Sequence, residues 1–176
     1  MNSKCSDGLS VLLANIARIH TNIRYADAKA GVVLLVNMSI LTAIYKLFGE
    51  EFPLYLENGD VNTFLLASIA LLLLGASLCL LVTRPRGDEY AKGRGPGLVD
   101  PVRIAQHEKS DEYIKEITGA ESNLIYQQAY ELIWDVSKID RAKYRMLSYA
   151  LVVSFIGWVL SMLTIALHII EVGSYG

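Results

Sequence analysis

Two runs of apolar residues that contain no Lys, Arg, Asp or Glu constrain this chain more than any other feature of its sequence. One run extends from Val61 to Val82, and the other extends from about Leu147 to Ile170. An α-helix needs about 20 apolar residues to cross a hydrocarbon core of roughly 30 Å, and it satisfies its backbone hydrogen bonds internally. Both runs are long enough to cross a bilayer as helices.

A third and shorter apolar run extends from Ala30 to Phe48. It contains Asn37 near its middle and Lys46 at its end. A lysine at a helix end can extend its amine into the membrane interface, and one asparagine is tolerated when another helix supplies its hydrogen-bond partner. The overall hydrophobic content of 53% also exceeds what is usual for a soluble domain of this length. We therefore expect a third span here.

The sequence predicts an all-α membrane protein with three transmembrane helices and cytosolic helical extensions. It shows neither a strand pattern nor a repeat of fixed period. The expected segments are a cytosolic amphipathic helix (1–29), transmembrane helix 1 (30–48), an external loop (49–60), transmembrane helix 2 (61–83), a cytosolic helical region (84–146), transmembrane helix 3 (147–170) and an external tail (171–176).

The distribution of basic residues predicts the orientation in the membrane, because loops rich in Lys and Arg stay in the cytosol. The flanks of the spans that we assign to the cytosol carry Arg18, Arg24, Lys29, Arg84, Arg86, Arg141, Lys143 and Arg145. The loop 49–60 contains only acidic charges. We expect a cytosolic N-terminus, an external C-terminus and no cleaved signal peptide, in a protein of the cell membrane.

Two amphipathic stripes precede the first and third spans and predict two long helices. The first stripe consists of Leu9, Leu12, Leu13, Ile16, Ile19 and Ile23. The second consists of Ile125, Ala129, Leu132, Ile133, Val136 and Ile139. Each stripe continues toward its span without a Pro or Gly, so we expect two parallel helices that enter the membrane from the cytosol and pack on each other.

Turn-forming residues separate the second span from the second long helix. Asp100 and Pro101 are typical of an N-cap followed by a first helical turn, which predicts a short helix from about Pro101 to Ile117. We expect this helix to stop at Gly119, because glycine can adopt the positive φ that suits a helix end.

The sequence contains no pattern that indicates an enzyme, a metal site or a cofactor. His20, His107 and His168 lack the spacing of metal ligands, and Cys5 and Cys79 suggest neither a metal site nor a disulfide. The glycines between residues 93 and 97 follow no strand and lack the lysine and hydroxyl of a phosphate-binding loop. We expect no catalytic activity and no nucleic-acid partner.

Charged residues gather where the first span begins. Arg24, Asp27 and Lys29 lie within six residues of one helix. One interpretation is membrane anchoring combined with an ion pair, which the spacing favours. The alternative is an anion site, to which Arg141, Lys143 and Arg145 could contribute from the second long helix.

Within the spans, a polar residue and a row of small residues are candidates for a structural role. Asn37 either joins helices or lines a pore, and the first of these is the more frequent role for an intramembrane asparagine. A small-residue face for close packing, within or between chains, is formed by Ala150, Ser154, Gly157 and Ser161.

Taken together, the signature around Arg24, Asp27-Ala-Lys29-Ala-Gly and Asn37, followed by two more spans and the segment from Ser137-Lys-Ile-Asp to Lys143-Tyr144, resembles the transmembrane effectors of the Pycsar antiphage systems. The resemblance extends from about Leu9 to Leu167.

This resemblance implies a bacterial inner-membrane protein that senses cyclic UMP or cyclic CMP made by a neighbouring pyrimidine cyclase. It further implies that the effector impairs the membrane and causes abortive infection. Together with the charge clusters above, it makes Arg24, Asp27, Lys29, Arg141, Lys143 and Tyr144 candidate ligand-binding residues.

The 63 residues from Arg84 to Met146 are too few for a usual β-roll nucleotide-binding domain, so a nucleotide site would be helical. Arginine or lysine would bind the phosphate, and an aromatic residue such as Tyr113, Tyr126, Tyr130 or Trp134 would stack on the base. We expect a homo-oligomer that contacts the lipid bilayer. The alternative function is a non-lytic membrane scaffold or anchor that recruits a cytosolic partner, and a constantly active channel is a weaker third hypothesis.

Overall fold

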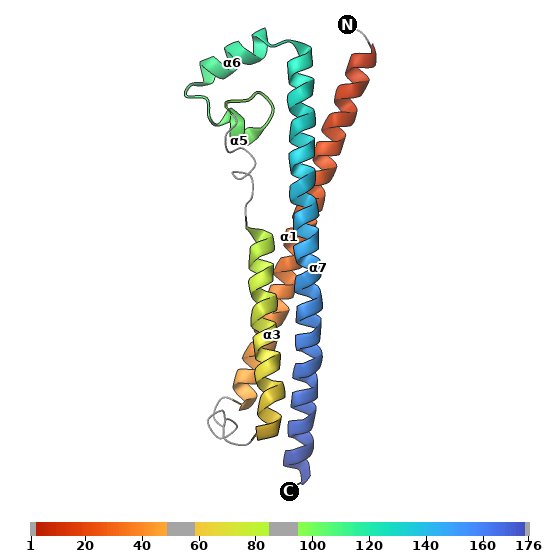
Figure 1. Ribbon diagram of the computed structural model, residues 1–176, viewed down its shortest axis with the longest axis vertical. Coiled ribbons are helices and arrows are strands. Elements are labelled where there is room, and N and C mark those ends of the chain that lie inside the picture. The colour runs from red at the N-terminus through yellow and green to blue at the C-terminus, as the bar shows by residue number, and fades with distance from the viewer. Residues whose placement is uncertain (1–2, 49–58, 85–94, 175–176) are drawn as a thin grey trace. The chain divides into compact units, whose positions relative to one another are not determined.

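The structure is a computed structural model that describes residues 3–48, 59–84 and 95–174. All regular elements in these ranges are helices: α1 (Ser3–Phe48), α3 (Gly59–Thr83), α5 (Pro101–Ile104), α6 (Ser110–Gly119) and α7 (Ser122–Ser174) (Figure 1). Three segments, Ser10–Phe48, Thr63–Thr83 and Ser122–Ile170, are long and apolar enough to cross a membrane. The all-α fold with three membrane-spanning helices is therefore confirmed. Glu50, Glu51 and Glu57 of the expected external loop, and Arg86 of the expected cytosolic region, lie outside the described residues.

The two longest helices are continuous. Helix α1 has 46 residues and α7 has 53 residues. Their interiors contain no proline, and the glycines Gly31 and Gly157 lie within regular helix. Because the apolar stripes continue into the apolar runs, one helix carries both the amphipathic and the membrane-crossing part of each segment.

The short helix expected from about Pro101 to Ile117 is in fact two helices, α5 and α6. The N-cap expectation is correct, since the Asp100 side chain accepts a hydrogen bond from the Val102 backbone N–H at 3.0 Å. Helix α5 then ends after one turn, and His107 hydrogen-bonds through its Nε2 to the Gly97 carbonyl at 3.2 Å. This contact joins the segments on either side of α5.

Helix α6 ends at Gly119, as expected, but not for the expected reason. Gly119 is its last residue but does not adopt a positive φ. The chain leaves the helix at Ala120, whose φ of −72° and ψ of 138° are extended. An extended C-cap ends the helix here without the left-handed conformation that only glycine adopts easily.

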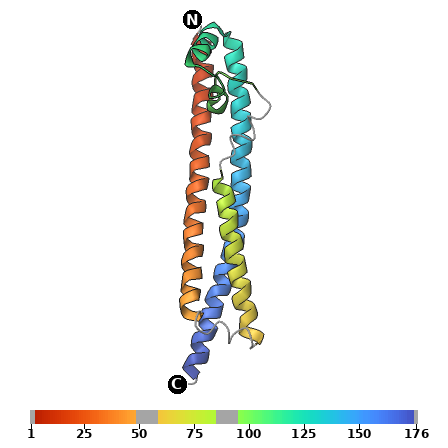
Figure 2. The ribbon, with the colours of Figure 1, turned by 90° about the vertical axis from the view of Figure 1, so that its left-hand side faces the viewer.

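The chain divides into two compact units. Unit 1 comprises residues 1–25 and 85–142, and unit 2 comprises residues 26–84 and 143–176. In unit 2, α1 and α7 run in the same direction and α3 runs antiparallel to both (Figure 2). Unit 2 is therefore a bundle of three helices, each of which contributes one apolar run.

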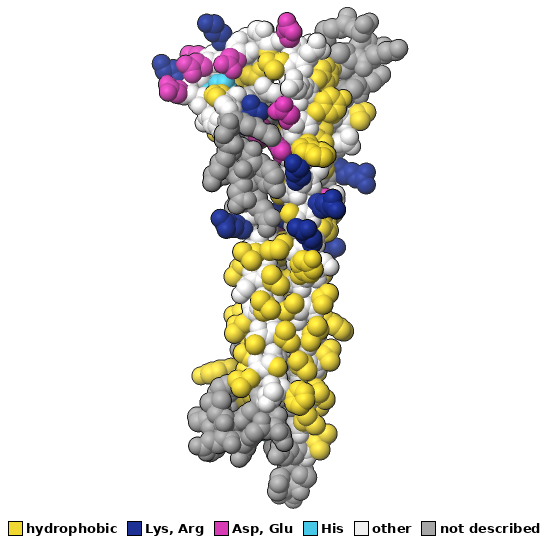
Figure 3. Space-filling view, viewed as in Figure 1, with side chains coloured by type: hydrophobic (Ala, Val, Ile, Leu, Met, Phe, Trp, Pro, Cys, Tyr) yellow, Lys and Arg dark blue, Asp and Glu magenta, His cyan; other side chains and the backbone are white. Residues whose placement is uncertain are grey.

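The core of unit 2 consists of two apolar clusters that join all three helices. The first cluster comprises Ala26, Ala30, Val33, Cys79, Val82, Leu147 and Ala150. The second comprises Ile44, Phe48, Leu65 and Leu72 of α1 and α3, with Trp158 and Ile165 of α7 packed against it. Large apolar side chains also cover the outside of this bundle (Figure 3), among them Leu35 with 69% and Met162 with 66% of their surface exposed. Large apolar residues outside are typical of helices in lipid, and the alanines of the first cluster let the helices approach closely there.

Unit 1 buries a smaller set of residues. Its buried apolar residues are Leu12 of α1, Leu98 of the connecting segment before α5, and Ala129 and Val136 of α7. The Gln128 side chain accepts a hydrogen bond from the Leu98 N–H at 2.7 Å, which fixes the connecting segment on α7. Leu13, expected in the apolar stripe, is 57% exposed, so the buried stripe of α1 is narrower than its sequence indicated.

The first prediction concerns Gly75 of α3. A Cβ at this position would lie 2.3 Å from the Ser154 Oγ and 3.0 Å from the Asn37 Nδ2. We expect Gly75→Ala to lower the free energy of unfolding by about 1–3 kcal/mol, because overpacking displaces well-packed neighbours. Thermal unfolding of the detergent-solubilised protein measures this loss.

Gly31→Ala is the matched control, because a Cβ at Gly31 of α1 would meet nothing within 4 Å. Alanine also has the higher helix propensity, so this variant should be as stable as the wild type or more stable. Equal stability of the two variants would contradict the close approach of α3 to α1 and α7.

Candidate functional site

Asn37 joins all three helices of unit 2. Its Nδ2 donates hydrogen bonds to the Ser154 Oγ of α7 at 2.9 Å and to the Leu72 carbonyl of α3 at 3.3 Å. Its Oδ1 accepts a hydrogen bond from the Trp158 Nε1 of α7 at 2.7 Å. Asn37 is fully buried, so these contacts replace the water that a membrane interior lacks.

The four predicted small residues of α7 all lie inside the three-helix bundle of one chain. Ala150 and Ser154 are fully buried, and Ser161 is 1% exposed. A Cβ at Gly157 would lie 3.2 Å from the Leu72 side chain of α3. The small-residue face of α7 therefore packs against helices of its own chain and carries the partner of Asn37.

Other hydroxyl groups in the bundle are satisfied locally. Ser68, Ser161 and Thr164 are buried and donate to backbone carbonyls three or four residues earlier in their own helices. Together with Asn37 and Ser154, they place five polar side chains in the interior while the outside is apolar. These five polar side chains are thus hidden from lipid, whereas the exposed hydroxyls of Ser39, Thr42 and Ser77 donate to backbone carbonyls of their own helices.

A second polar contact between α1 and α7 in unit 2 is an ion pair, ten residues before Asn37 along α1. The Lys143 Nζ donates to the Asp27 Oδ1 at 2.5 Å. The Lys143 side chain is 5% exposed and the Asp27 side chain is 35% exposed. Lys143 is one helical turn before Leu147, on the face that packs against Ala26 and Ala30. A buried ammonium requires a partner, and Asp27 supplies it.

Of the six candidate ligand-binding residues, the structure brings Asp27 and Lys143 together. Lys29 and Tyr144 belong to unit 2 and are exposed, Tyr144 to 37%. Arg24 and Arg141 belong to unit 1, where both are exposed. The ligand-binding role of these six residues stays a prediction.

Sequence reasoning missed Trp158 and Gly75 as parts of the Asn37 junction. Trp158 lies one turn after Ser154, so the spacing of α7 already places it on the same face. The role of Gly75 depends on how α3 is rotated against its neighbours, and no sequence pattern reports that rotation.

Asp140 ends the Ser137-Lys-Ile-Asp segment of the signature, but it was not among the candidate site residues; it lies in unit 1. Its Oδ1 is buried and has no hydrogen-bond partner within the described parts of the chain. Burial raises the pKa of this carboxyl above its ordinary value, and a hydrogen bond with the Asn22 side chain opposes part of that rise. The contact with Asn22 connects α1 to α7 in unit 1.

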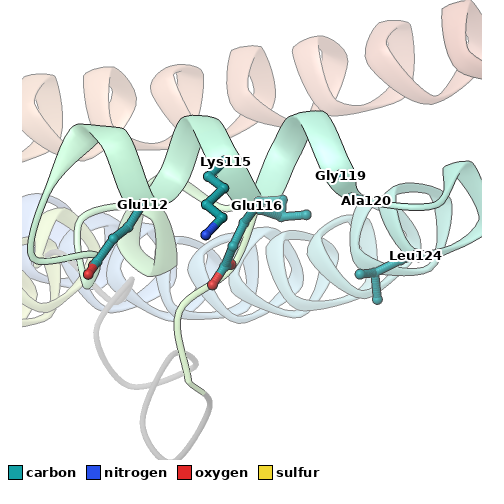
Figure 4. A pocket seen from close by; sticks show the side chains of 7 residues that line it. Glu112, Lys115, Glu116, Gly119, Ala120 and Leu124 are labelled. Atoms are coloured by element: carbon teal, nitrogen blue, oxygen red, sulfur yellow. The ribbon is translucent and has the colours of Figure 1, made fainter.

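Unit 1 also contains a shallow cavity of about 590 Å³ alongside α6 (Figure 4). It is lined by Leu98, Glu112, Lys115, Glu116, Gly119, Ala120 and Leu124. Two carboxylates against one ammonium make the lining acidic, which disfavours an anionic ligand. Among the residues that the structure describes, no cluster of three or more His, Cys, Asp or Glu side chains could bind a metal ion.

The second prediction is an energetic coupling between Asn37 and Trp158. In a double-mutant cycle of Asn37→Leu and Trp158→Phe, the two losses of stability should be non-additive by about 1 kcal/mol, the scale of interhelical hydrogen bonds in membranes. Chemical or thermal unfolding in detergent measures the four stabilities.

The cycle between Asn37→Leu and Trp134→Phe is the control, because Trp134 contacts Lys138 instead. In this control cycle, the losses of stability of the two single variants should add up to that of the double variant. Additive losses for Trp158 as well would show that the hydrogen bond from its Nε1 contributes nothing.

The third prediction is an asymmetry in the ion pair. Asp27→Asn leaves the almost fully buried Lys143 ammonium without a carboxylate and should cost about 3 kcal/mol, the lower end for a broken buried pair. Lys143→Met removes the buried charge and leaves Asp27 one-third exposed to solvent, so it should cost less. The free energies of unfolding of the two variants decide this, and a more destabilising Lys143→Met would refute the burial argument.

The comparison with known protein families agrees with these features. A family model described as Pycsar effector protein domain matches residues 11–170. No curated protein and no solved structure matches the chain. The match includes all three apolar helices, the Asn37 junction and the Asp27–Lys143 pair. The chain belongs to the Pycsar effector protein family.

Proposed function

We propose that this chain is an inner-membrane effector that binds cyclic UMP or cyclic CMP and, when bound, impairs the membrane and causes abortive infection. The family match over residues 11–170 carries the proposal. The three helices that are long and apolar enough to span a bilayer support it, because they give the chain a place in the membrane on which it would act.

The arrangement of unit 2 corresponds to the resting state in this proposal. Its five buried uncharged polar side chains are hydrogen-bonded inside the bundle, and the exposed hydroxyls of the spans donate to carbonyls of their own helices. Separation of α1 from α7 would expose Asn37, Ser154 and the hydroxyls near them. Exposed polar groups at membrane depth recruit water or a second copy, and either event weakens the permeability barrier.

A ligand can drive this change only if it binds one arrangement better than the other. The Asp27–Lys143 pair offers a physical route. In the resting state the Lys143 ammonium is neutralised by Asp27. An anionic ligand that takes the place of Asp27 would gain the charge of Lys143 while it removes one contact between α1 and α7. The phosphate of a cyclic nucleotide is an anion of this kind.

Lys29 and Tyr144 supply the remaining groups that such a site needs within unit 2. Lys29 lies two residues after Asp27 on α1 and is exposed, and the proposal requires its long, flexible side chain to reach the phosphate from another face of the helix. Tyr144 directly follows Lys143 and offers a ring for base stacking. We further propose that Arg24 and Arg141 of unit 1 raise the local concentration of the anion through their charge.

The fourth prediction tests this function in cells with a potential-sensitive dye. Co-expression of the chain with a cyclase that makes cyclic UMP or cyclic CMP should depolarise the membrane, whereas the chain alone should not. Lys29→Gln should reduce the nucleotide-triggered depolarisation at least tenfold, because it removes a phosphate-binding charge and leaves α1 apolar enough to insert.

Lys46→Gln is the matched control, since it makes the same change in the same helix at the opposite end of the apolar run. It should depolarise like the wild type. If the inserted wild-type protein responds to neither nucleotide, the gated effector is wrong and the non-lytic scaffold becomes the better hypothesis. If an inserted Lys29→Gln variant depolarises the membrane fully, Lys29 does not bind the nucleotide, and membrane anchoring becomes the better interpretation of this residue.

A further inference from the structure

Helix α7 exposes a row of aromatic and basic side chains in unit 1. Tyr130, Trp134, Lys138 and Arg141 follow one another at intervals of four, four and three residues, which places them on one face of the helix. Tyr130 is 61% exposed and Trp134 is 62% exposed. The Lys138 Nζ lies 4.9 Å from the centre of the Trp134 ring, in a cation–π contact. We call these four residues the α7 stripe.

The composition of the α7 stripe is typical of a protein-binding surface. Tyr, Trp and Arg are the residues most enriched among interface side chains that dominate binding energy. The stripe is a convex helix face, whereas small-molecule sites are concave and enclose most of their ligand. Lys138 and Arg141 also make it unsuitable as a lipid-facing surface in the hydrocarbon core. It therefore fits a protein partner with an acidic and partly apolar depression.

The same unit of the chain contains such a depression, the cavity alongside α6. Leu98, Ala120 and Leu124 contribute apolar lining, and Glu112 and Glu116 contribute carboxylates. Helix α6 as a whole carries three carboxylates and one lysine. Figure 4 shows Glu112 and Glu116 on α6 and Leu124 beyond the end of that helix, with Lys115 between the two carboxylates. The lining therefore offers both carboxylates and apolar side chains.

We propose that the partner is a second copy of this chain, whose α7 stripe enters the α6 cavity of its neighbour. Trp134 and Tyr130 would contact the apolar lining, and Lys138 and Arg141 would pair with Glu112 and Glu116 of the other copy. Within one chain the exposure of Trp134 shows that its ring does not occupy the cavity. The complementary charges of the two surfaces favour a second copy over an unrelated partner.

This interface is heterologous, because the stripe and the cavity are different surfaces. Each copy that is bound through its stripe still presents a free cavity, so association continues until the copies close into a ring. Copies inserted in one bilayer share one orientation, which a head-to-tail contact requires. The proposal does not rest on nucleotide binding and can be tested without any ligand.

The fifth prediction uses charge reversal on each surface, measured by sedimentation of the detergent-solubilised full chain. The wild type should associate at low salt and dissociate at least tenfold more readily at high salt, because the contact pairs exposed charges. Lys138→Glu with Arg141→Glu, and Glu112→Lys with Glu116→Lys, should each weaken association at least tenfold, since each variant opposes like charges.

A mixture of the two charge-reversed proteins restores opposite charges at both kinds of contact and should associate like the wild type. Trp134→Ala, which leaves every charge in place, should also weaken association at least tenfold. Arg18→Glu changes an exposed charge of α1 outside both surfaces and should associate normally.

The proposal is overturned if the wild type sediments as a monomer at low salt. It is equally overturned if folded Trp134→Ala associates like the wild type, or if the mixture stays monomeric while both variants retain wild-type helicity. Restoration by mixing together with loss in Trp134→Ala establishes the contact.

Discussion

The amide of Asn37 is the interaction on which the membrane bundle depends. An amide buried in hydrocarbon without partners costs several kcal/mol, so the three helices must approach closely enough to satisfy it. Ser154, Trp158 and the Leu72 carbonyl do so from two other helices. Gly75 has no side chain to keep α3 away from this junction, and the small residues of α7 allow the same approach on its side. Packing of the large apolar residues follows from this arrangement and could not specify it alone, because lipid is as apolar as leucine.

Two polar contacts hold α1 and α7 in one register. Along α1, Asp27 and Asn37 are ten residues apart, and along α7 their partners Lys143 and Ser154 are eleven residues apart. Nearly equal spacings let two parallel helices make both contacts at once, since each residue advances a helix by about 1.5 Å. A shift of either helix by one turn would break both contacts together. The two contacts therefore form and break as a unit, and under the proposed function an anion that competes for Lys143 would act on one of them.

Much of this architecture was predictable because it depends on local patterns. The three apolar runs indicated the spans, the absence of proline indicated the long helices, and Asp100 followed by Pro101 indicated the start of α5. The signature with Arg24, Asp27, Lys29 and Asn37 indicated the family. The break between α5 and α6 was missed because residues 105–109 contain no proline or glycine that would mark it, although a contact between His107 and Gly97, ten residues apart, accompanies it. Other features depend on how each helix is rotated against its neighbours, and no pattern in one sequence reports that rotation. They are the pairing of Lys143 with Asp27, 116 residues earlier, and the roles of Trp158 and Gly75.

The most direct measurement of the central claim follows the indole N–H of Trp158 by NMR in nanodiscs. Trp134→Phe leaves Trp158 as the single tryptophan, so one indole resonance reports the hydrogen bond to Asn37. The account predicts a hydrogen-bonded, exchange-protected resonance in the resting protein that shifts and loses protection when the activating cyclic nucleotide is added. If the nucleotide permeabilises the membrane while this resonance keeps its position and protection, the Asn37 junction stays closed during activation and the account is wrong.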